Sequence, residues 1–144
     1  MKVEIRSTQR KIRLNLRRIK RDSLKALSIL GLKEAELSIL FCSPSRMRSL
    51  NLRYRGINRA TDVLAFPLYS PGEIPHEGHY LPGDIVINPS QAASQAKEHG
   101  LTLGEEIRRL LIHGLLHLIG YDHEKGGHAE RRMRAKEREM LERI

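Results

Sequence analysis

The chain has 144 residues, the length of one ordinary domain, which argues against a two-domain enzyme with a separate cofactor module. Apolar residues make up 40% and charged residues 30% of it, a globular composition that excludes a fibre or wholesale disorder. The formal net charge of +9 points to a polyanionic partner. We therefore expect a single domain over residues 1–144.

The positive charge is confined to the N-terminal part of the chain. Residues 1–61 contain 16 Lys or Arg against 4 Asp or Glu, whereas residues 62–144 contain 10 against 13. No acidic residue occurs between Ile5 and Arg21, or between Leu37 and Thr61. The sequence leaves two interpretations open for these acid-free segments: solvated faces, or a surface for nucleic acid or another polyanion.

The predicted elements alternate between strand and helix along the whole chain. The first half predicts a strand, a helix, a strand and a helix at about residues 3–5, 10–30, 36–42 and 44–54. The second half predicts a strand, a loop, a strand and three helices at about residues 62–66, 71–82, 84–87, 89–99, 102–119 and 130–143. Four strands and about five helices indicate an α+β (mixed α/β) domain.

One cysteine and the lack of long apolar runs suggest where the protein resides. Cys42 has no second cysteine to pair with, as is typical of a reducing cytosol. The N-terminus lacks the apolar core of a signal peptide, and no apolar run approaches the length of a membrane span. We expect a cytoplasmic protein without a membrane partner.

Three histidines in the segment His-Gly-Leu-Leu-His-Leu-Ile-Gly-Tyr-Asp-His carry the chemistry. His113 and His117 are four residues apart, so on a helix they project from nearly the same side. Gly120 permits a turn that brings His123 round as a third ligand. Three neutral imidazoles with an open fourth position are typical of a catalytic zinc site, and a single cysteine excludes a thiolate-rich structural site. The alternative, three ordinary histidines, fits this spacing poorly.

The spacing also matches the H-E-x-x-H-x-x-G-x-x-H signature of metzincin-type zinc peptidases, with one departure. Gly114 stands where those peptidases have the glutamate that acts as general base. Metal binding should survive this change. The departure favours a different substrate or a different base.

Three blocks of the sequence together resemble the YbeY family of bacterial endoribonucleases. They are H-G-L-L-H-L-I-G-Y-D-H at residues 113–123, L-N-L-R-Y-R-G-I-N-R-A-T-D-V-L-A-F-P at residues 50–67, and G-D-I-V-I at residues 83–87. The resemblance extends over essentially the whole chain. The Pro that usually precedes Thr61 in the family is Ala60 here, a change we expect to affect the loop alone.

The resemblance implies a metal-dependent endoribonuclease that cleaves single-stranded RNA. The implied role is maturation of ribosomal RNA, notably at the three-prime end of the small-subunit RNA, and ribosome quality control. The implied partners are single-stranded or ribosomal RNA and the small ribosomal subunit with its factors, without DNA specificity. The family's metal histidines fall on His113, His117 and His123, with one Zn²⁺ expected per chain, and its functional arginine falls on Arg55. We expect His113 and Arg55 to be catalytic, Arg55 by forming two parallel hydrogen bonds to a phosphate.

The sequence leaves the proton acceptor and the nucleophile open. The nucleophile is either a metal-activated water or the neighbouring ribose hydroxyl. The candidate carboxylates are Asp122, Glu124 and Asp84, and the first two could instead orient His123.

The remaining histidines and the aromatic residues carry weaker signals. His76 and His79 are three apart in a loop rich in Pro and Gly, and His99 is expected at a helix C-terminus. Aromatic residues are only 4% of the chain and form no interleaved series, so we expect RNA binding through the backbone with little base readout.

Two other functions compete with the endoribonuclease. One is a zinc metallopeptidase-like hydrolase, supported by the ligand spacing and weakened by Gly114. The other is a non-catalytic ribosome-binding factor in which the metal only stabilises the fold.

Overall fold

Alternating strands and helices build the α+β fold that the sequence predicts. The computed structural model describes residues 1–70, 72–75, 78–122 and 126–144, and within them it contains four strands and five helices. These elements are, in chain order, β1 (Lys2–Ser7), α1 (Leu16–Ile29), β2 (Glu36–Phe41), α2 (Pro44–Arg55), β3 (Val63–Pro67), β4 (Gly83–Ile87), α3 (Pro89–His99), α4 (Leu103–Leu118) and α5 (Gly127–Arg143). Among the described residues, no helix is long and apolar enough to cross a membrane.

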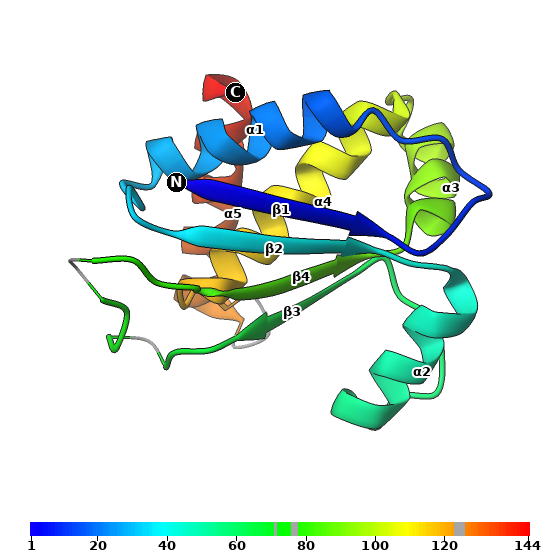
Figure 1. Cartoon of the computed structure of the whole chain (residues 1–144), viewed down its shortest axis with the longest axis horizontal. Coiled ribbons are helices and arrows are strands. Elements are labelled where there is room, and N and C mark those ends of the chain that lie inside the picture. The colour runs from blue at the N-terminus through cyan, green and yellow to red at the C-terminus, as the bar shows by residue number, and fades with distance from the viewer. Residues whose placement is uncertain (71, 76–77, 123–125) are drawn as a thin grey trace.

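The four strands form one sheet in the order β1-β2-β4-β3 (Figure 1). The strands β1, β2 and β4 are parallel, and β3 joins β4 as an antiparallel edge strand. In this register Ile85 of β4 is paired with Ile39 of β2 on one side and with Ala65 of β3 on the other. The sheet therefore ends in an antiparallel strand with one unpaired side.

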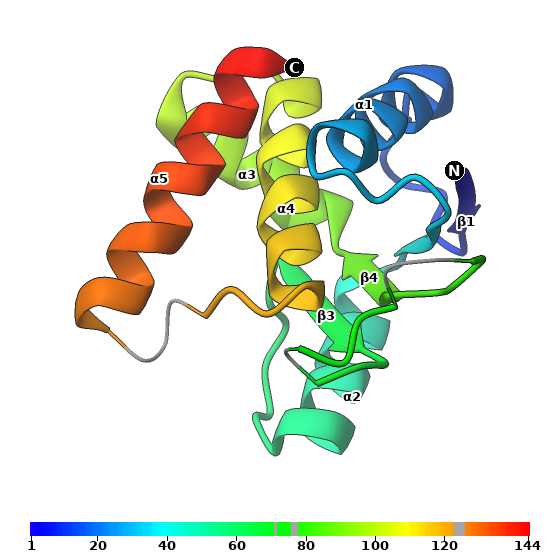
Figure 2. The same cartoon turned by 90° about the vertical axis from the view of Figure 1, so that its left-hand side faces the viewer.

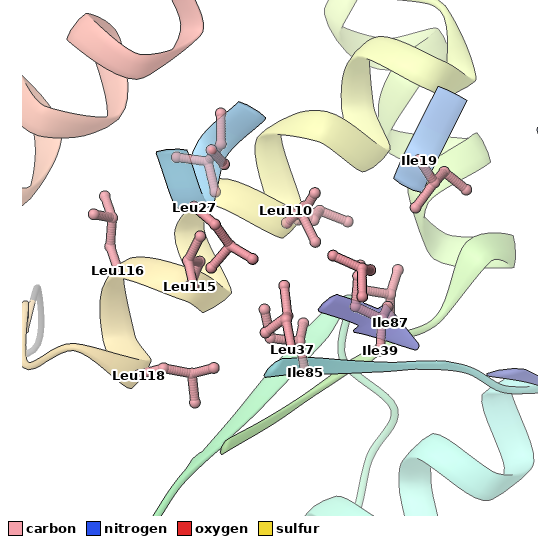
Figure 3. Packing of buried hydrophobic residues seen from close by; sticks show 14 of the residues in the cluster. Ile19, Leu27, Leu37, Ile39, Ile85, Ile87, Leu110, Leu115, Leu116 and Leu118 are labelled. Carbon is pink, nitrogen blue, oxygen red and sulfur yellow. The ribbon is translucent and has the colours of Figure 1, made fainter. Parts of the chain in front are cut away.

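The two faces of the sheet are covered by different helices, because successive residues of a strand point to opposite faces. Ile85 and Ile87 belong to the main core beneath α4, which includes leucines of α1, β2 and α4 (Figure 3). Val86, between them, packs with Met47 of α2 in a second, smaller cluster. The helix α4 lies between α1 and α5 (Figure 2). The histidine helix is thus held by the sheet and by the helices α1, α3 and α5.

The structure differs from the sequence prediction at two helix starts. We predicted a helix from about residue 10, but α1 begins at Leu16. The side chain of Gln9 instead bonds both backbone groups of Ile12, which holds this segment in a turn, and Asn15 caps the helix by accepting from Arg18 N. The last helix begins at Gly127 rather than at residue 130. The other predicted elements lie within one or two residues of their expected bounds.

Candidate metal centre and active-site cleft

The helix α4 fixes the positions of His113 and His117. The helix begins at a capping box, in which Thr102 and Glu105 exchange hydrogen bonds of 3.0 and 3.2 Å through their side chains and backbone N–H groups. Its buried side consists mainly of leucine and isoleucine. The two histidines are half-buried at the border of this apolar side. They are therefore presented by a rigid element rather than by a loop.

The two imidazole rings converge on one point. The Nε2 atoms of His113 and His117 lie 3.2 Å apart, and the ring planes are inclined by 74°. Two nitrogen ligands of a tetrahedral zinc ion, at the usual bond lengths, are separated by about 3.3 Å. The pair therefore fits the edge of a tetrahedral metal site.

The third predicted ligand, His123, lies outside the described residues. Among the residues that the structure does describe, no group of three or more His, Cys, Asp or Glu side chains is arranged to hold a metal ion. The described part of the site thus contributes two imidazole nitrogens.

A carboxylate on α5 completes the environment of His113. Glu137 Oε1 lies 2.6 Å from His113 Nδ1, so the Nδ1–H group donates to the carboxylate and the Nε2 lone pair faces His117. Sequence reasoning missed Glu137. It lies 24 residues from His113 on a helix with several other glutamates, and no local spacing distinguishes it from them.

Gly114 allows α4 to pack closely on the sheet. A Cβ atom at this position would lie 3.0 Å from Cγ2 of Ile85 on β4. A glutamate of the metzincin signature would start from that same Cβ atom, and the Ile85 side chain would have to shift by a few tenths of an ångström to admit it. The position that carries the general base in those peptidases is thus packed closely against β4 in this protein.

The two histidines line a cleft of about 670 Å³ that Arg55 also lines. Its wall is formed by β3, by the ends of α2 and α4, and by the residues that follow them: Tyr54, Arg55, Thr61–Pro67, Tyr69, His113, Gly114, His117 and Gly120–Asp122. Arg55 is exposed at the C-terminus of α2, where a cation interacts favourably with the helix dipole. Gly56 then ends the helix in the left-handed conformation, with φ of 72°. The structure thus brings Arg55 and two of the three predicted ligands to one cleft.

The candidate carboxylates fall in different places. Asp122 lines the cleft, whereas Asp84 is the second residue of β4 and is not among the described residues of the cleft. Glu124 lies outside the described residues. The cleft also contains a carboxylate that sequence reasoning did not consider, Asp62 at the start of β3.

Asp62 is held in place by hydrogen bonds. Its Oδ1 accepts from Val63 N at 2.7 Å, and its Oδ2 accepts from the Gln95 amide at 3.2 Å. The same amide nitrogen donates to Glu106 of α4 at 3.1 Å. These hydrogen bonds therefore connect the wall of the cleft to α3 and α4. Because the three residues are distant in the sequence, no local sequence pattern predicts this arrangement.

Two other histidines, His79 and His99, are engaged away from this cleft. His79 Nε2 lies 2.8 Å from Glu36 Oε2, with its side chain 65% exposed. His99 ends α3, as predicted, and its Nδ1 lies 3.5 Å from Glu106. His76 lies outside the described residues.

The two acid-free segments meet at the pair of strands β1 and β2, but their helices are separated in space. The helices α1 and α2 lie at opposite ends of the molecule in both views (Figures 1 and 2). The exposed arginines of the second segment are on α2 or in the loop after it, and they are Arg46, Arg48, Arg53, Arg55 and Arg59. Of these two basic surfaces, the one at α2 adjoins the cleft.

Comparisons with known proteins identify the family. The family model described as Endoribonuclease YbeY matches residues 2–144 of this chain. The chain belongs to the endoribonuclease YbeY family. This membership makes it an enzyme of the endoribonuclease class and confirms the resemblance inferred from its sequence.

Relatives in the YbeY family match along most of the chain. Endoribonuclease YbeY of Aquifex aeolicus is 41% identical over 138 residues, which cover 92% of this chain and 89% of the relative. Endoribonuclease YbeY of Anaeromyxobacter sp. is 44% identical over 140 residues, covering 97% of this chain and 70% of the relative. A solution structure of a Thermotoga maritima protein shares the fold, with a TM-score of 0.67 and 26% identity, over 98% of this chain and 87% of that one.

Proposed function

We propose that this chain is a zinc-dependent endoribonuclease that cleaves single-stranded RNA and matures ribosomal RNA, notably the three-prime end of the small-subunit RNA. One observation carries the proposal: His113, His117 and Arg55 line the same cleft in a member of the YbeY family. A metal site beside a guanidinium suits a phosphodiester substrate, because the metal ion and the guanidinium can both bind the negatively charged phosphate.

The proposed metal ligands are His113 and His117, with His123 as the third. Support comes from the 3.2 Å separation of the two Nε2 atoms and from a donor set that zinc accepts. When bound, a zinc ion supplies a Lewis acid for a phosphoryl oxygen and makes water a stronger acid.

The side chains of the cleft perform the remaining tasks. Glu137 accepts a hydrogen bond from the Nδ1–H group of His113. This bond holds the imidazole in the tautomer that leaves Nε2 available for a metal. Arg55 donates two parallel hydrogen bonds to the non-bridging oxygens of the phosphate and binds the charge that develops there. Asp122 supplies a carboxylate on the cleft wall, where Gly114 provides none.

The charge distribution supports RNA as the substrate. The exposed arginines around α2 lie beside the cleft in a segment without acidic residues. Such a positively charged surface attracts the phosphate backbone of RNA. We also propose that one domain over residues 1–144 carries the activity, that it acts on the small ribosomal subunit and its factors, and that it works in the cytoplasm.

The test combines metal analysis with a cleavage panel. Purified protein is assayed for bound metal and then incubated with single-stranded RNA, with duplex RNA of the same sequence and with an unstructured peptide. We expect zinc at one per chain, cleavage of the single strand alone, and loss of cleavage in EDTA and in His113→Ala. His79→Ala is the matched control, because that histidine lies outside the cleft and pairs with Glu36 at the surface.

Each alternative function has a distinct result in this panel. Peptide cleavage that EDTA abolishes would establish a peptidase. Folded, metal-free protein that supports ribosome maturation as well as the metal-loaded form would establish a binding factor. The ends of the RNA products identify the nucleophile, because attack by the ribose hydroxyl leaves a cyclic phosphate and attack by water does not.

A further inference from the structure

Three tyrosines that are scattered in the sequence meet at the cleft. The chain has four tyrosines and no tryptophan, and Tyr54, Tyr69 and Tyr121 all line the cleft that contains His113 and His117. They come from α2, from the segment after β3 and from the segment after α4. Aromatic residues are therefore rare in the chain as a whole but concentrated at the cleft.

Tyr54 is the most exposed aromatic side chain at this cleft. Its relative exposure is 57%. The ring is held edge to face against Phe66 of β3, with centroids 5.3 Å apart and planes inclined by 68°. The guanidinium of Arg53 lies over one face of the ring, 5.4 Å from its centroid, which leaves the other face for a base. The plane of Tyr54 is thus fixed by its neighbours while much of the ring remains accessible.

An accessible, oriented ring beside a phosphate-binding arginine is suited to a nucleobase. Tyr54 is followed directly by Arg55, and both line the cleft. Unpaired bases stack on aromatic side chains irrespective of their identity, whereas the bases of a duplex are already stacked and paired. Because Phe66 orients the ring in advance, little ordering is needed when a base binds.

We propose that Tyr54 is the stacking platform for an unpaired nucleobase next to the phosphate held by Arg55, so that this ring contributes to the preference for single-stranded RNA. The inference rests on the proposed function and names a specificity determinant of the same cleft. It adds a stacking contact to the expected binding, which is dominated by the RNA backbone and has little readout of base identity. Tyr69 and Tyr121 place two further rings along the same cleft.

The test measures stacking without cleavage. A single-stranded RNA that carries one 2-aminopurine is titrated with the full-length protein in EDTA, because stacking on an aromatic ring quenches the fluorescence of this base. Tyr54→Ala is expected to reduce the quenching and to weaken single-strand binding by about 5- to 100-fold. Tyr54→Phe should retain both, since it keeps the ring. Duplex RNA of the same sequence should bind wild type and Tyr54→Ala equally.

Leu52→Ala is the matched control, because Leu52 is 48% exposed on the same helix and is not among the described residues that line the cleft. Circular dichroism verifies that each variant is folded, and Tyr54→Leu replaces the alanine variant if that one is not. Unchanged single-strand affinity in Tyr54→Ala, or an equal loss in Tyr54→Phe, would overturn the proposal.

This experiment separates the two proposals. Tyr54-dependent quenching by a protein that cleaves no RNA when loaded with metal would refute the endoribonuclease activity and leave the stacking platform intact. Cleavage of single strands at wild-type rate and affinity by Tyr54→Ala would refute the platform and leave the activity intact.

Discussion

His113 Nδ1 and Glu137 Oε1 lie 2.6 Å apart, and this hydrogen bond joins the histidine helix α4 to the C-terminal helix α5. We predict that Glu137→Gln lowers zinc affinity by about 10- to 100-fold, because the amide is a weaker acceptor and no longer raises the basicity of the imidazole. Competition with a chelator of known affinity measures the change. Glu139→Gln is the control, since Glu139 pairs with Lys136 and Arg143 at the surface. Equal zinc affinities for the two variants would contradict this role of Glu137.

Gly114→Ala should destabilise the protein by about 1–3 kcal/mol, because the added Cβ would lie 3.0 Å from Ile85 Cγ2. Gly114→Glu, which restores the peptidase signature, should destabilise it further and confer no peptidase activity. Urea unfolding monitored by circular dichroism gives the free energies. In an Ile85→Ala background the cost of Gly114→Ala should largely disappear. A penalty that persists there would show that the strain lies elsewhere.

Arg55→Ala should lower turnover of single-stranded RNA by about 100-fold while the metal content stays at the wild-type level. Arg55→Lys should restore little of the lost turnover, because an ammonium group cannot form the two parallel hydrogen bonds of a guanidinium. Steady-state kinetics assign the loss to kcat or to KM. Arg46→Ala, at the other end of α2, serves as the control and should leave kcat unchanged. Equal kcat values for Arg55→Ala and Arg46→Ala would remove Arg55 from the reaction.

Glu106, whose side chain is fully buried, should make stability depend on acidic pH. Burial by itself raises the pKa of this carboxyl, but hydrogen bonds from Arg109, His99 and Gln95 more than offset it and lower the pKa below its ordinary value of 4.5. The carboxylate therefore stabilises the fold at neutral pH, and its contribution is lost as the pH falls from 4.5 through the lower pKa of the folded state.

Glu106→Gln tests this pH dependence. We expect the variant to lose about 2 kcal/mol of unfolding free energy at pH 7. The difference from wild type should shrink as the pH falls below 4.5, because Glu106 itself then becomes protonated. Urea unfolding between pH 3 and pH 7 measures both quantities. A difference that stays constant over this range would contradict the assignment.

Local signals were sufficient to predict most of the fold. Apolar periodicity and the Ser43-Pro44 and Asn88-Pro89 caps located the elements, and both caps form as expected, with Pro at the start of α2 and α3. The start of α1 was missed because Ile12 and Leu16 continue a helical spacing, whereas the Gln9 side chain takes both backbone groups of Ile12. A side chain that competes for the backbone is invisible to periodicity.

The candidate site was predictable only where its residues are neighbours in the sequence. His113 and His117 could be paired because a helix brings residues four apart together. The other residues of the site come from other parts of the chain, and their positions follow from how the elements pack. They are Glu137, which bonds His113, the carboxylate Asp62 and the three tyrosines of the cleft. Gly114 could be recognised as a departure from the peptidase signature, but its close packing against Ile85 is visible only in the structure.

Because α1 and α2 are far apart, the affinity of the protein for RNA should depend on the length of the RNA. A strand of a few nucleotides in the cleft would reach the arginines of α2 alone, whereas a long strand or a folded ribosomal RNA could extend to the basic residues around α1 at the far end of the molecule. Affinity should then rise in two steps as RNA is lengthened. The second step should carry the steeper salt dependence, because additional phosphates release additional counterions.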